Sequence, residues 1–308
     1  MLPPLKDSSN VHESLPMKQD PDKLTSLLSD SSVRGLVFDL DGTIIGYDHT
    51  RSGFITPRTV EAFQNAHEAG IQVVFVTGRP VRWLAPLEDA LGHAGPVICS
   101  NGAVIYDMAD HTVLESYPMP LETVLQARDL ISALDATASF GAETLSGFHL
   151  DSGFVDRERA QPGDDRAWSY QVGLTLEDVL PDQPEVVKFL AKTRTHHPDA
   201  FLSDVRAALG ELLAVTHSAP GLALVEMSRP DVNKASTLEH FAAAHGIGAA
   251  EVVAFGDMPN DLEMIHWAGT GVAVGSGHPT LLAAADLVAE ACDDDGVARV
   301  IEHLLTLD

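Results

Sequence analysis

The sequence predicts an α/β protein in which a doubly wound, mostly parallel sheet is interrupted by an inserted α+β domain. Three observations support this fold class. Apolar, β-branched runs alternate with helix-like segments at both ends of the chain, as in βαβ units. Short acidic clusters directly follow two of these runs, at residues 33–38 and 252–255. The middle third loses the alternation, which indicates an insertion between two halves of one domain.

The first half of the expected core contains three strands and two helices. The strands are short apolar runs, typical of strands buried on both faces of a parallel sheet: residues 33–38, 71–76 and 96–99. Thr56 can cap the first helix, Pro57 suits its first turn and Gly70 ends it. A second helix is expected from Pro80 to Gly92.

The inserted segment and the second half of the core follow. In the insertion we expect helices at 121–134 and 198–209, strands at 185–192, 212–216 and 222–227, and an acidic loop at 157–165. The resumed core is expected to contain strands at 252–255 and 272–274 and helices at 233–245, from 261, at 280–285 and at 296–305. The expected division is a loose tail at 1–32, a core of 33–105 and 228–308, and an insertion at 106–227.

Composition narrows the class of protein. The chain has 308 residues and a formal charge of −26, which argues against nucleic acid or an anionic membrane surface as a partner. Two cysteines are too few for a disulfide framework, and the 14 scattered histidines do not have zinc-ligand spacing. No secretory signal and no long apolar segment is evident. We therefore expect a cytoplasmic protein.

The two acidic clusters are the strongest functional signal. They are residues 39–43 (DLDGT) and 256–261 (GDMPND), each directly after a predicted buried strand. The carboxyl ends of parallel strands meet at one edge of the sheet, where ligands bind. Converging carboxylates would repel each other by roughly a few kcal/mol per close pair at an effective dielectric of ~20 unless a cation joined them. Mg²⁺ suits such oxygen ligands. A single cluster could be an ordinary turn, and neither has the complete spacing of a calcium loop.

Two further signals suggest phosphate binding. Thr77 and Gly78 follow a predicted strand and open the next connection, where free backbone N–H groups can hold an anion, although a plain helix cap would use the same residues. Lys234 lies at the start of a helix, where a cation is disfavoured by the helix dipole. An anionic substrate would explain this position, and a surface lysine is the alternative.

Taken together, these features resemble the haloacid dehalogenase superfamily of phosphohydrolases, and more closely its Cof-type branch of sugar-phosphate and small-metabolite phosphatases. The resemblance spans about residues 33–305. It rests on these segments: 39–43 (DLDGT), 76–79 (VTGR), 100–103 (SNGA), 233–234 (NK), 256–264 (GDMPNDLEM), 271–275 (GVAVG) and 295–298 (DGVA).

The resemblance implies a role for each aspartate of the first cluster. Asp39 would be the nucleophile that attacks phosphorus and forms an aspartyl-phosphate. Asp41 would protonate the leaving oxygen and later deprotonate the water that hydrolyses the intermediate. Dehalogenases do not need a proton donor two residues after the nucleophile, so Asp41 favours phosphate chemistry.

The resemblance also implies a cofactor and a set of ligands. Mg²⁺ would be held by the Asp39 carboxylate, the Asp41 backbone carbonyl and the Asp257 carboxylate, with Asp261 in support. The phosphate would be held by Leu40, Thr77, Gly78, Lys234 and Asn260. The substrate would be a small phosphomonoester, such as a sugar phosphate, a flavin or pyridoxal phosphate, or a nucleotide.

The inserted domain is expected to cover the core and select the leaving group. Its candidate substrate contacts are His149, Asp151, Arg157 and Arg159, whereas Lys188 is expected to support a strand face. Two other functions stay open. A phosphomutase of the same fold would need a cationic covering domain, and a non-catalytic metabolite sensor would be expected to have lost Asp39 or Asp41. The oligomeric state is not readable from the sequence.

Overall fold

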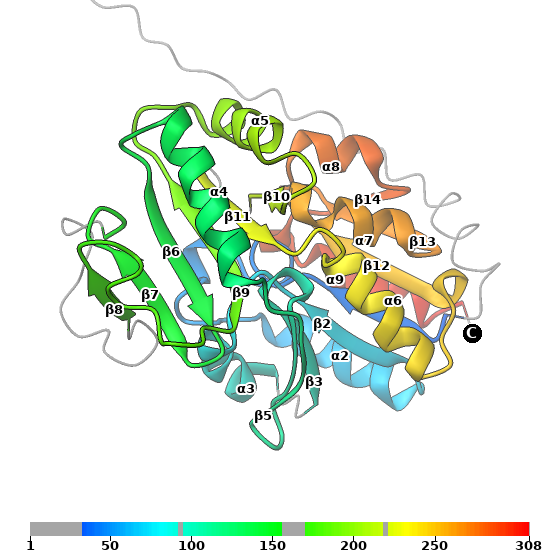
Figure 1. The fold of residues 1–308 in the computed structure, drawn as a ribbon. Helices are drawn as coiled ribbons and strands as arrows, with labels where there is room; N and C mark the ends of the chain where they lie inside the picture. Colours follow the sequence, from blue (N-terminus) through cyan, green and yellow to red (C-terminus); the bar gives the residue numbers. More distant parts are fainter. Residues whose placement is uncertain (1–32, 92–94, 156–169, 218–220, 308) are drawn as a thin grey trace, which may run out of the picture.

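The computed structural model describes residues 33–91, 95–155, 170–217 and 221–307, which form two sheets with helices packed on them (Figure 1). The predicted tail, the end of the helix expected at Gly92 and the acidic loop at 157–165 lie outside the described residues. Among the described residues, no helix is both long and apolar enough to cross a lipid bilayer.

The larger sheet has eight strands in the order β14-β13-β12-β1-β2-β3-β4-β5. Their bounds are β1 Gly35–Phe38, β2 Gln72–Val76, β3 Pro96–Cys99, β4 Val104–Asp107, β5 Thr112–Ser116, β12 Val252–Gly256, β13 Thr270–Val274 and β14 Leu287–Ala289. The pairings from β14 to β3 are parallel, and β4 and β5 add antiparallel strands at one edge. Strand β1 lies between β2 and β12, so the two halves of the core meet at the centre of the sheet.

Helices cover both faces of this sheet, which confirms the doubly wound fold. They are α2 Pro57–Glu68, α3 Ala85–Leu91, α6 Lys234–Ala244, α7 Leu262–Trp267, α8 Pro279–Ala284 and α9 Gly296–Leu304. Buried side chains of α2, α3 and α9 pack in one apolar cluster, and those of α6 and α7 pack in another with the alternate side chains of the central strands. Figure 1 shows α6 and α7 on one side of the sheet and α2 and α9 on the other.

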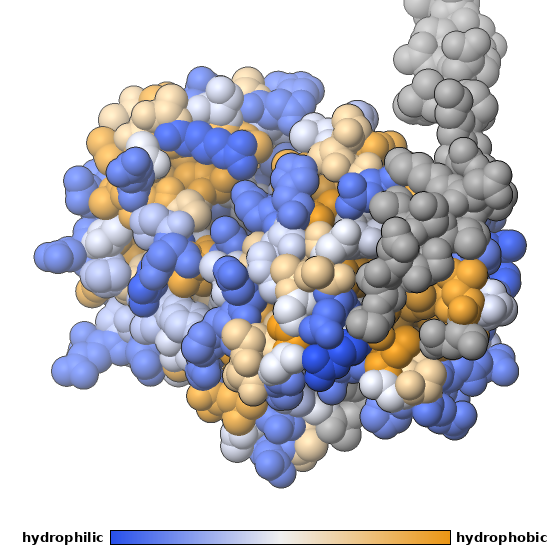
Figure 2. Space-filling view, turned by 90° about the vertical axis from the view of Figure 1, so that its right-hand side faces the viewer, coloured by the Kyte–Doolittle hydropathy of each residue, from blue (hydrophilic) through white to orange (hydrophobic). Residues whose placement is uncertain are grey.

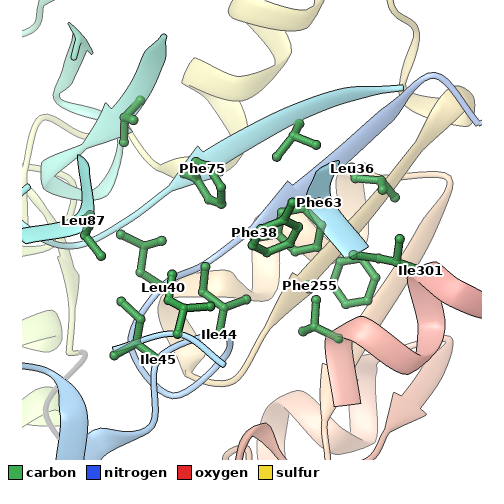
Figure 3. Packing of buried hydrophobic residues seen from close by; sticks show 14 of the residues in the cluster. Leu36, Phe38, Leu40, Ile44, Ile45, Phe63, Phe75, Leu87, Phe255 and Ile301 are labelled. Atoms are coloured by element: carbon green, nitrogen blue, oxygen red, sulfur yellow. The ribbon is translucent and has the colours of Figure 1, made fainter. Parts of the chain in front are cut away.

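Aromatic side chains fill the centre of the first cluster (Figure 3). The ring of Phe38 on β1 lies 4.8 Å from that of Phe63 on α2 and 4.9 Å from that of Phe255 on β12, measured between centroids. Phe75 on β2 is 6.1 Å from Phe38. Such buried rings contribute large apolar areas and favourable tilted contacts. They fix the relative positions of β1, β2 and β12, whose carboxyl ends carry the predicted motifs.

The helix boundaries follow the sequence signals, with one exception. Thr56 caps α2 by accepting a hydrogen bond from the N–H of Thr59. The single helix expected from Pro80 is instead a 3₁₀ turn, η2 (Val81–Trp83), followed by α3. Pro86 has no N–H to bond to the carbonyl of Arg82, so a helix that starts at residue 81 cannot continue through it.

The smaller sheet belongs to the inserted segment and has the order β10-β11-β9-β6-β7-β8. Its strands are β6 Ser139–Thr144, β7 Gly147–Asp151, β8 Tyr170–Gly173, β9 Val186–Lys192, β10 Ala214–Thr216 and β11 Leu224–Ser228. Helices α4 Leu121–Leu134 and α5 Pro198–Leu209 pack on one face of it around a separate apolar cluster. The predicted domain boundary at residue 105 falls inside β4, and the strand pairing keeps β4 and β5 in the larger sheet.

The surface is mixed in hydropathy. On the face shown in Figure 2, hydrophilic residues are interspersed with apolar patches. Scattered apolar surface of this kind is ordinary for a folded protein.

Candidate active site

The predicted site residues lie at the carboxyl ends of the three central strands. Asp39 follows β1, Thr77 follows β2 and Asp257 follows β12. The N–H of Asp39 donates to the carbonyl of Phe255 at 3.0 Å, which extends the pairing of β1 with β12 to the first residue of the acidic motif. Two motifs separated by more than two hundred residues therefore meet at one edge of the sheet.

Three buried aspartates form the centre of the site. Carboxylate oxygens of Asp39, Asp257 and Asp261 lie within 4.8 Å of one another. The Nζ atom of Lys234 donates to Oδ1 of Asp39 at 2.5 Å and to Oδ1 of Asp261 at 2.6 Å. The Lys234 side chain is fully buried, although it occupies the first residue of α6, where the helix dipole disfavours a cation. Its two carboxylate partners compensate for that position.

The electrostatics of the cluster indicate an excess of negative charge. Burial raises the pKa of Asp39 well above its usual range; Lys234 opposes this shift, and Asp261 and Asp257 add to it. Burial, followed by the charge of Asp261, raises the pKa of Asp257 to about 7. Burial alone would lower the pKa of Lys234, but Asp261 and Asp39 outweigh it and raise that pKa. One lysine does not balance three carboxylates, so the cluster favours an additional cation.

Neighbouring side chains fix the orientation of Asp257. The hydroxyl of Tyr47, in the 3₁₀ turn η1 (Tyr47–His49), donates to Oδ2 of Asp257 at 2.6 Å, and Thr43 Oγ1 donates to Oδ1 at 3.4 Å. Gly42 has a φ of +87°, and a Cβ atom there would collide with the Asp257 carboxylate. The glycine of the first motif is therefore required by close approach of the second motif.

Asp261 stabilises the turn that carries Asp257. Its Oδ2 atom accepts from the backbone N–H groups of Asp257 and Met258, both at 3.0 Å, while its Oδ1 accepts from Lys234. Both oxygens of Asp261 are therefore engaged within the protein. Asp39 accepts a side-chain hydrogen bond on Oδ1 alone among the described residues, and Oδ1 of Asp257 accepts only a long one, at 3.4 Å from Thr43, so these two residues are better able than Asp261 to offer an oxygen to a metal ion.

Asp41 pairs with a buried arginine. The Nε and Nη2 atoms of Arg79 donate to Oδ2 and Oδ1 of Asp41 at 2.6 and 2.5 Å. Arg79 is also held by the carbonyls of Thr50 and Trp83. The two-point pairing fixes the plane of the Asp41 carboxylate beside the cavity. Arg79 occupies one lone pair of each Asp41 oxygen, so the carboxylate keeps lone pairs that can face a leaving group in the cavity.

The predicted phosphate-binding residues occupy different positions relative to a cavity of about 450 Å³. Thr77, Gly78 and Asn260 line it. The Oγ1 of Thr77 accepts from the N–H of Arg79 at 3.0 Å, which leaves its own hydroxyl hydrogen to donate. Leu40 and Lys234 are buried.

The cavity lies between the two sheets. From the larger domain, Asp39, Asp41 and Asp257 contribute to one wall; from the smaller sheet, the opposite wall includes Glu143, Phe148, Lys188, Leu190, Leu224 and Glu226. Alternation along the strands places Lys188 and Glu226 on the sheet face away from the apolar cluster of α4 and α5. The helix-free face of the smaller sheet thus covers the carboxylate cluster.

The candidate contacts of the inserted domain are only partly located. His149 is buried, with Nε2 3.1 Å from Thr144 Oγ1. Asp151 accepts the backbone N–H of Gly153 in its own turn and that of Phe140 on the neighbouring strand β6. Neither lines the cavity. Arg157 and Arg159 lie outside the described residues. Lys188, expected to support a strand face rather than a substrate, pairs with Glu226 of the neighbouring strand β11, on the face that lines the cavity.

Sequence reasoning missed several residues of the site. Tyr47 lies in a connector without a distinctive pattern, and Arg79 was noted only as part of a motif. The aromatic wall formed by Trp83, Phe148 and Phe154 had no sequence signal, since single aromatic residues in separate segments are as common in a core as in a pocket.

Comparison with known proteins agrees with this geometry. Residues 36–301 match the family model described as haloacid dehalogenase-like hydrolase. The chain is 31% identical over 282 residues to the pyridoxal phosphate phosphatase YbhA of Escherichia coli, covering 89% of this chain and 100% of that protein. It is 27% identical over 278 residues to the 5-amino-6-(5-phospho-D-ribitylamino)uracil phosphatase YitU of Bacillus subtilis, covering 88% of this chain and 97% of that protein.

Solved structures share the fold. A phosphatase of the haloalkanoate superfamily from Bacteroides thetaiotaomicron superposes with a TM-score of 0.70 at 22% identity, covering 90% of this chain and 96% of that one. A protein from Streptococcus mutans gives a TM-score of 0.75 at 18% identity, covering 89% of this chain and all of that one. At these identities the likeness shows the fold alone.

Proposed function

Because the chain belongs to the haloacid dehalogenase-like hydrolase family, we propose that it is a Mg²⁺-dependent phosphatase that transfers the phosphoryl group of a small phosphomonoester first to Asp39 and then to water. The observation that carries this proposal is the buried cluster of Asp39, Asp257 and Asp261 around Lys234, at the floor of a cavity covered by a second sheet.

In the first step, a carboxylate oxygen of Asp39 attacks phosphorus while the bond from phosphorus to the leaving oxygen breaks. The contact of Asp39 Oδ1 with Lys234 orients the carboxylate, and the cation stabilises its ionised form in a buried site. The hydroxyl of Thr77 and the amide of Asn260, both on the cavity, can donate to phosphate oxygens. Lys234 supplies positive charge from behind the nucleophile.

Asp41 is the proposed acid and base. Its side chain is 25% exposed and lines the cavity, so it can reach the leaving oxygen there. As the leaving group departs, Asp41 gives it a proton; in the second step Asp41 takes a proton from the water that attacks the aspartyl-phosphate. Arg79 binds one lone pair of each Asp41 oxygen and holds the carboxylate in place, while a remaining lone pair carries the proton to and from the cavity.

The donor set fits Mg²⁺. Asp39 and Asp257 are buried carboxylates whose pKa values are raised by burial and by neighbouring acids, which is the condition that a bound cation relieves. We propose these two carboxylates and the Asp41 backbone carbonyl as ligands, with Asp261 in support. When bound, the ion supplies charge stabilisation for the transferring phosphoryl group.

The leaving group is proposed to carry a planar ring. The cavity wall includes the aromatic side chains of Trp83, Phe148 and Phe154, and the Arg82 guanidinium stacks 4.9 Å from the Trp83 ring and 4.7 Å from the Phe148 ring. Flat apolar and cationic surfaces favour a heteroaromatic partner over a polyhydroxylated sugar. YbhA and YitU are named for substrates that contain such rings.

The alternatives have less support. A phosphomutase needs free cations to hold a second phosphate, but among the described cavity residues Lys188 is paired with Glu226 and Arg82 with Glu143. A non-catalytic sensor does not explain why both Asp39 and Asp41 are retained on the cavity.

The test is hydrolysis of p-nitrophenyl phosphate by the purified chain with Mg²⁺, after chelation, and after Mg²⁺ is restored. We expect activity to disappear with chelator and to return with the metal. The Asp39→Asn variant, prepared identically, controls for contaminating phosphatases. Activity unaffected by chelation would remove the metal from the mechanism. Comparing kcat/KM for pyridoxal 5′-phosphate and glucose 6-phosphate then tests the leaving group, and preference for the sugar would contradict the proposed ring.

A further inference from the structure

The Ser-Asn-Gly segment at residues 100–102 has no role in the steps above, yet its backbone is unusual. Ser100, Asn101 and Gly102 have consecutive positive φ angles of 52°, 58° and 101°. A Cβ atom at Gly102 would collide with the carbonyl of Asn233, and asparagine tolerates the left-handed region better than most residues. This turn, between β3 and the antiparallel β4, places the Asn101 side chain under the cavity, where it is buried.

Asn101 links the smaller sheet to the phosphate-binding side of the site. Its Nδ2 donates to Oε2 of Glu226 on β11 at 2.5 Å. Its Oδ1 accepts from Nδ2 of Asn260 at 3.1 Å. A continuous chain of hydrogen bonds therefore runs from Glu226 of the smaller sheet through Asn101 to Asn260. Asn260 lines the cavity, as do the catalytic aspartates.

The carboxylate sets the direction of this chain. An ionised Glu226 can only accept hydrogen bonds, so Asn101 must present its amide hydrogens to it and its oxygen to Asn260. Asn260 must then present Nδ2 to Asn101. The Oδ1 of Asn260 is buried without a partner among the described residues, so this end of the carboxamide is held by nothing else.

The same carboxylate is fixed by Lys188 on the neighbouring strand, which also contacts the larger domain. Lys188 on β9 donates to Oε2 of Glu226 at 2.9 Å and to the backbone carbonyl of Gly78 at 2.5 Å. Lys188 and Glu226 side chains are 7% and 9% exposed, so both contacts are shielded from water. Two residues of the smaller sheet therefore hold proposed phosphate-binding residues of the larger domain. Lys188 contacts Gly78 directly, and Glu226 contacts Asn260 through Asn101.

We propose that Glu226 is a positioning residue that acts through Asn101 to orient the carboxamide of Asn260 toward the transferring phosphoryl group. The inference rests on the proposed phosphatase function. Its consequence is that the phosphate-binding set is complete only when the smaller sheet is seated on the cavity, so that covering of the substrate and ordering of Asn260 occur together.

The test exchanges the donor and acceptor of one hydrogen bond. Glu226→Gln and Asn101→Asp each disturb the chain, the first by removing the obligate acceptor and the second by setting two carboxylates against each other. In the double variant, the amide at 226 donates to the carboxylate at 101, whose other oxygen still accepts from Asn260.

We expect each single variant to lose roughly tenfold in kcat, as for loss of a buried charged hydrogen bond, and the double variant to recover to within about threefold of wild type. Aspartate also tolerates the left-handed backbone at position 101.

A matched cycle separates positioning from simple loss of contact between the sheets. Glu143→Gln breaks another ion pair between the smaller sheet and the larger domain, that of Glu143 with Arg82, and is combined with Asn101→Asp. This second cycle should depart from additivity by much less than the first, because Glu143 shares no hydrogen bond with Asn101 among those observed and is coupled to Glu226 only through the charge of their neighbour Lys188. Melting temperatures of all variants are measured in parallel.

Affinity for inorganic phosphate in the presence of Mg²⁺, measured by calorimetry, should follow the same pattern as kcat. The proposal is overturned if a folded single variant keeps wild-type kcat and phosphate affinity, or if the double variant is as impaired as the product of the two singles. If wild type hydrolyses no phosphomonoester, the proposed function fails by itself, and phosphate affinity across the four proteins still decides the role of Glu226.

Discussion

The two walls of the cavity handle charge in different ways. The catalytic wall, defined as Asp39, Asp257, Asp261 and Lys234, holds more carboxylates than cations and raises the pKa values of Asp39 and Asp257 through burial and mutual repulsion. The covering wall, defined as Glu143, Phe148, Lys188 and Glu226, pairs each glutamate with a cation. The first wall is therefore incomplete without a further cation, whereas the charges of the second are balanced once Arg82 of the larger domain is counted.

This difference separates chemistry from selection. A wall with unbalanced charge binds a metal and a phosphoryl group whatever the rest of the substrate is. A neutral wall with an aromatic surface contributes shape and ring contacts, which discriminate among leaving groups. Changes to the catalytic wall should affect all substrates, and changes to the covering wall should affect some more than others.

The largest effect is expected from Lys234→Ala. This change leaves Asp39 and Asp261 buried without their cation, which typically costs about 3–5 kcal/mol. We expect a marked loss of stability in denaturant titrations, with weaker phosphate binding and lower kcat. Arg34→Ala is the control, because its pair with Glu251 is substantially exposed and should contribute much less to stability. Equal losses in the two variants would contradict the unbalanced charge of the catalytic wall.

The pH dependence of stability without metal should have the opposite sign from that of an ordinary salt bridge. Asp257 has a pKa of about 7 when folded and an ordinary value of 3.8, so the folded state binds the extra proton between these values. The protonated Asp257 carboxyl therefore adds to the free energy of unfolding, by an amount on the order of a few kcal/mol. This stabilisation is complete below about pH 4 and is lost as pH rises through about 7. Mg²⁺ should restore this stability, with an apparent affinity that increases from pH 6 to pH 8.

The difference between wild type and Asp257→Asn isolates this contribution. His149 and His217 have pKa values lowered mainly by burial, and they act in the other direction below about pH 6.5, equally in both proteins. Denaturation midpoints measured across this range in chelator should show the wild-type advantage shrinking as pH rises. An advantage that grows with pH would show that Asp257 is ionised and satisfied without a metal.

A smaller effect is expected from Tyr47→Phe. The Tyr47 hydroxyl donates to Asp257 and helps to lower the pKa that burial raises, so its loss should make protons stronger competitors of Mg²⁺. We expect roughly tenfold weaker Mg²⁺ affinity by calorimetry at pH 7, as for other groups that orient a metal ligand. Tyr106→Phe, which removes a hydroxyl near His111 on the surface, should leave Mg²⁺ affinity unchanged. Unchanged affinity in both variants would remove Tyr47 from the metal site.

The smallest effect is expected on the covering wall. Phe148→Ala removes one aromatic surface of the cavity and should lower kcat/KM for pyridoxal 5′-phosphate by roughly fivefold, with little change for glycerol phosphate. Phe54→Ala, an exposed aromatic residue outside the cavity lining, is the matched control. A similar loss for both substrates would mean that Phe148 supports the fold of the wall rather than selection.

The same contrast explains what could be predicted from the sequence. Asp39, Asp257 and Lys234 are readable because each stands next to a local signal, the end of a buried strand or the start of a helix. Tyr47 and Glu226 act on partners 210 and 125 residues away, Asp257 and Asn101, and nothing in their own segments indicates those contacts. Strands β6 and β7, separated by a short turn at residues 145–146, have no clear alternation in the sequence, so the face of the smaller sheet that lines the cavity could not be assigned.

The central claim is that Asp39 accepts the phosphoryl group, and trapping that group tests it most directly. In Asp41→Asn, p-nitrophenyl phosphate still offers a good leaving group for the first step, while the second step lacks its base, so the intermediate should accumulate. Acid quench and peptide mapping of this variant with Mg²⁺ should find phosphate on Asp39, and none in an Asp39→Asn control. Turnover with phosphate on another residue, or with none on the protein under the same quench, would contradict the account.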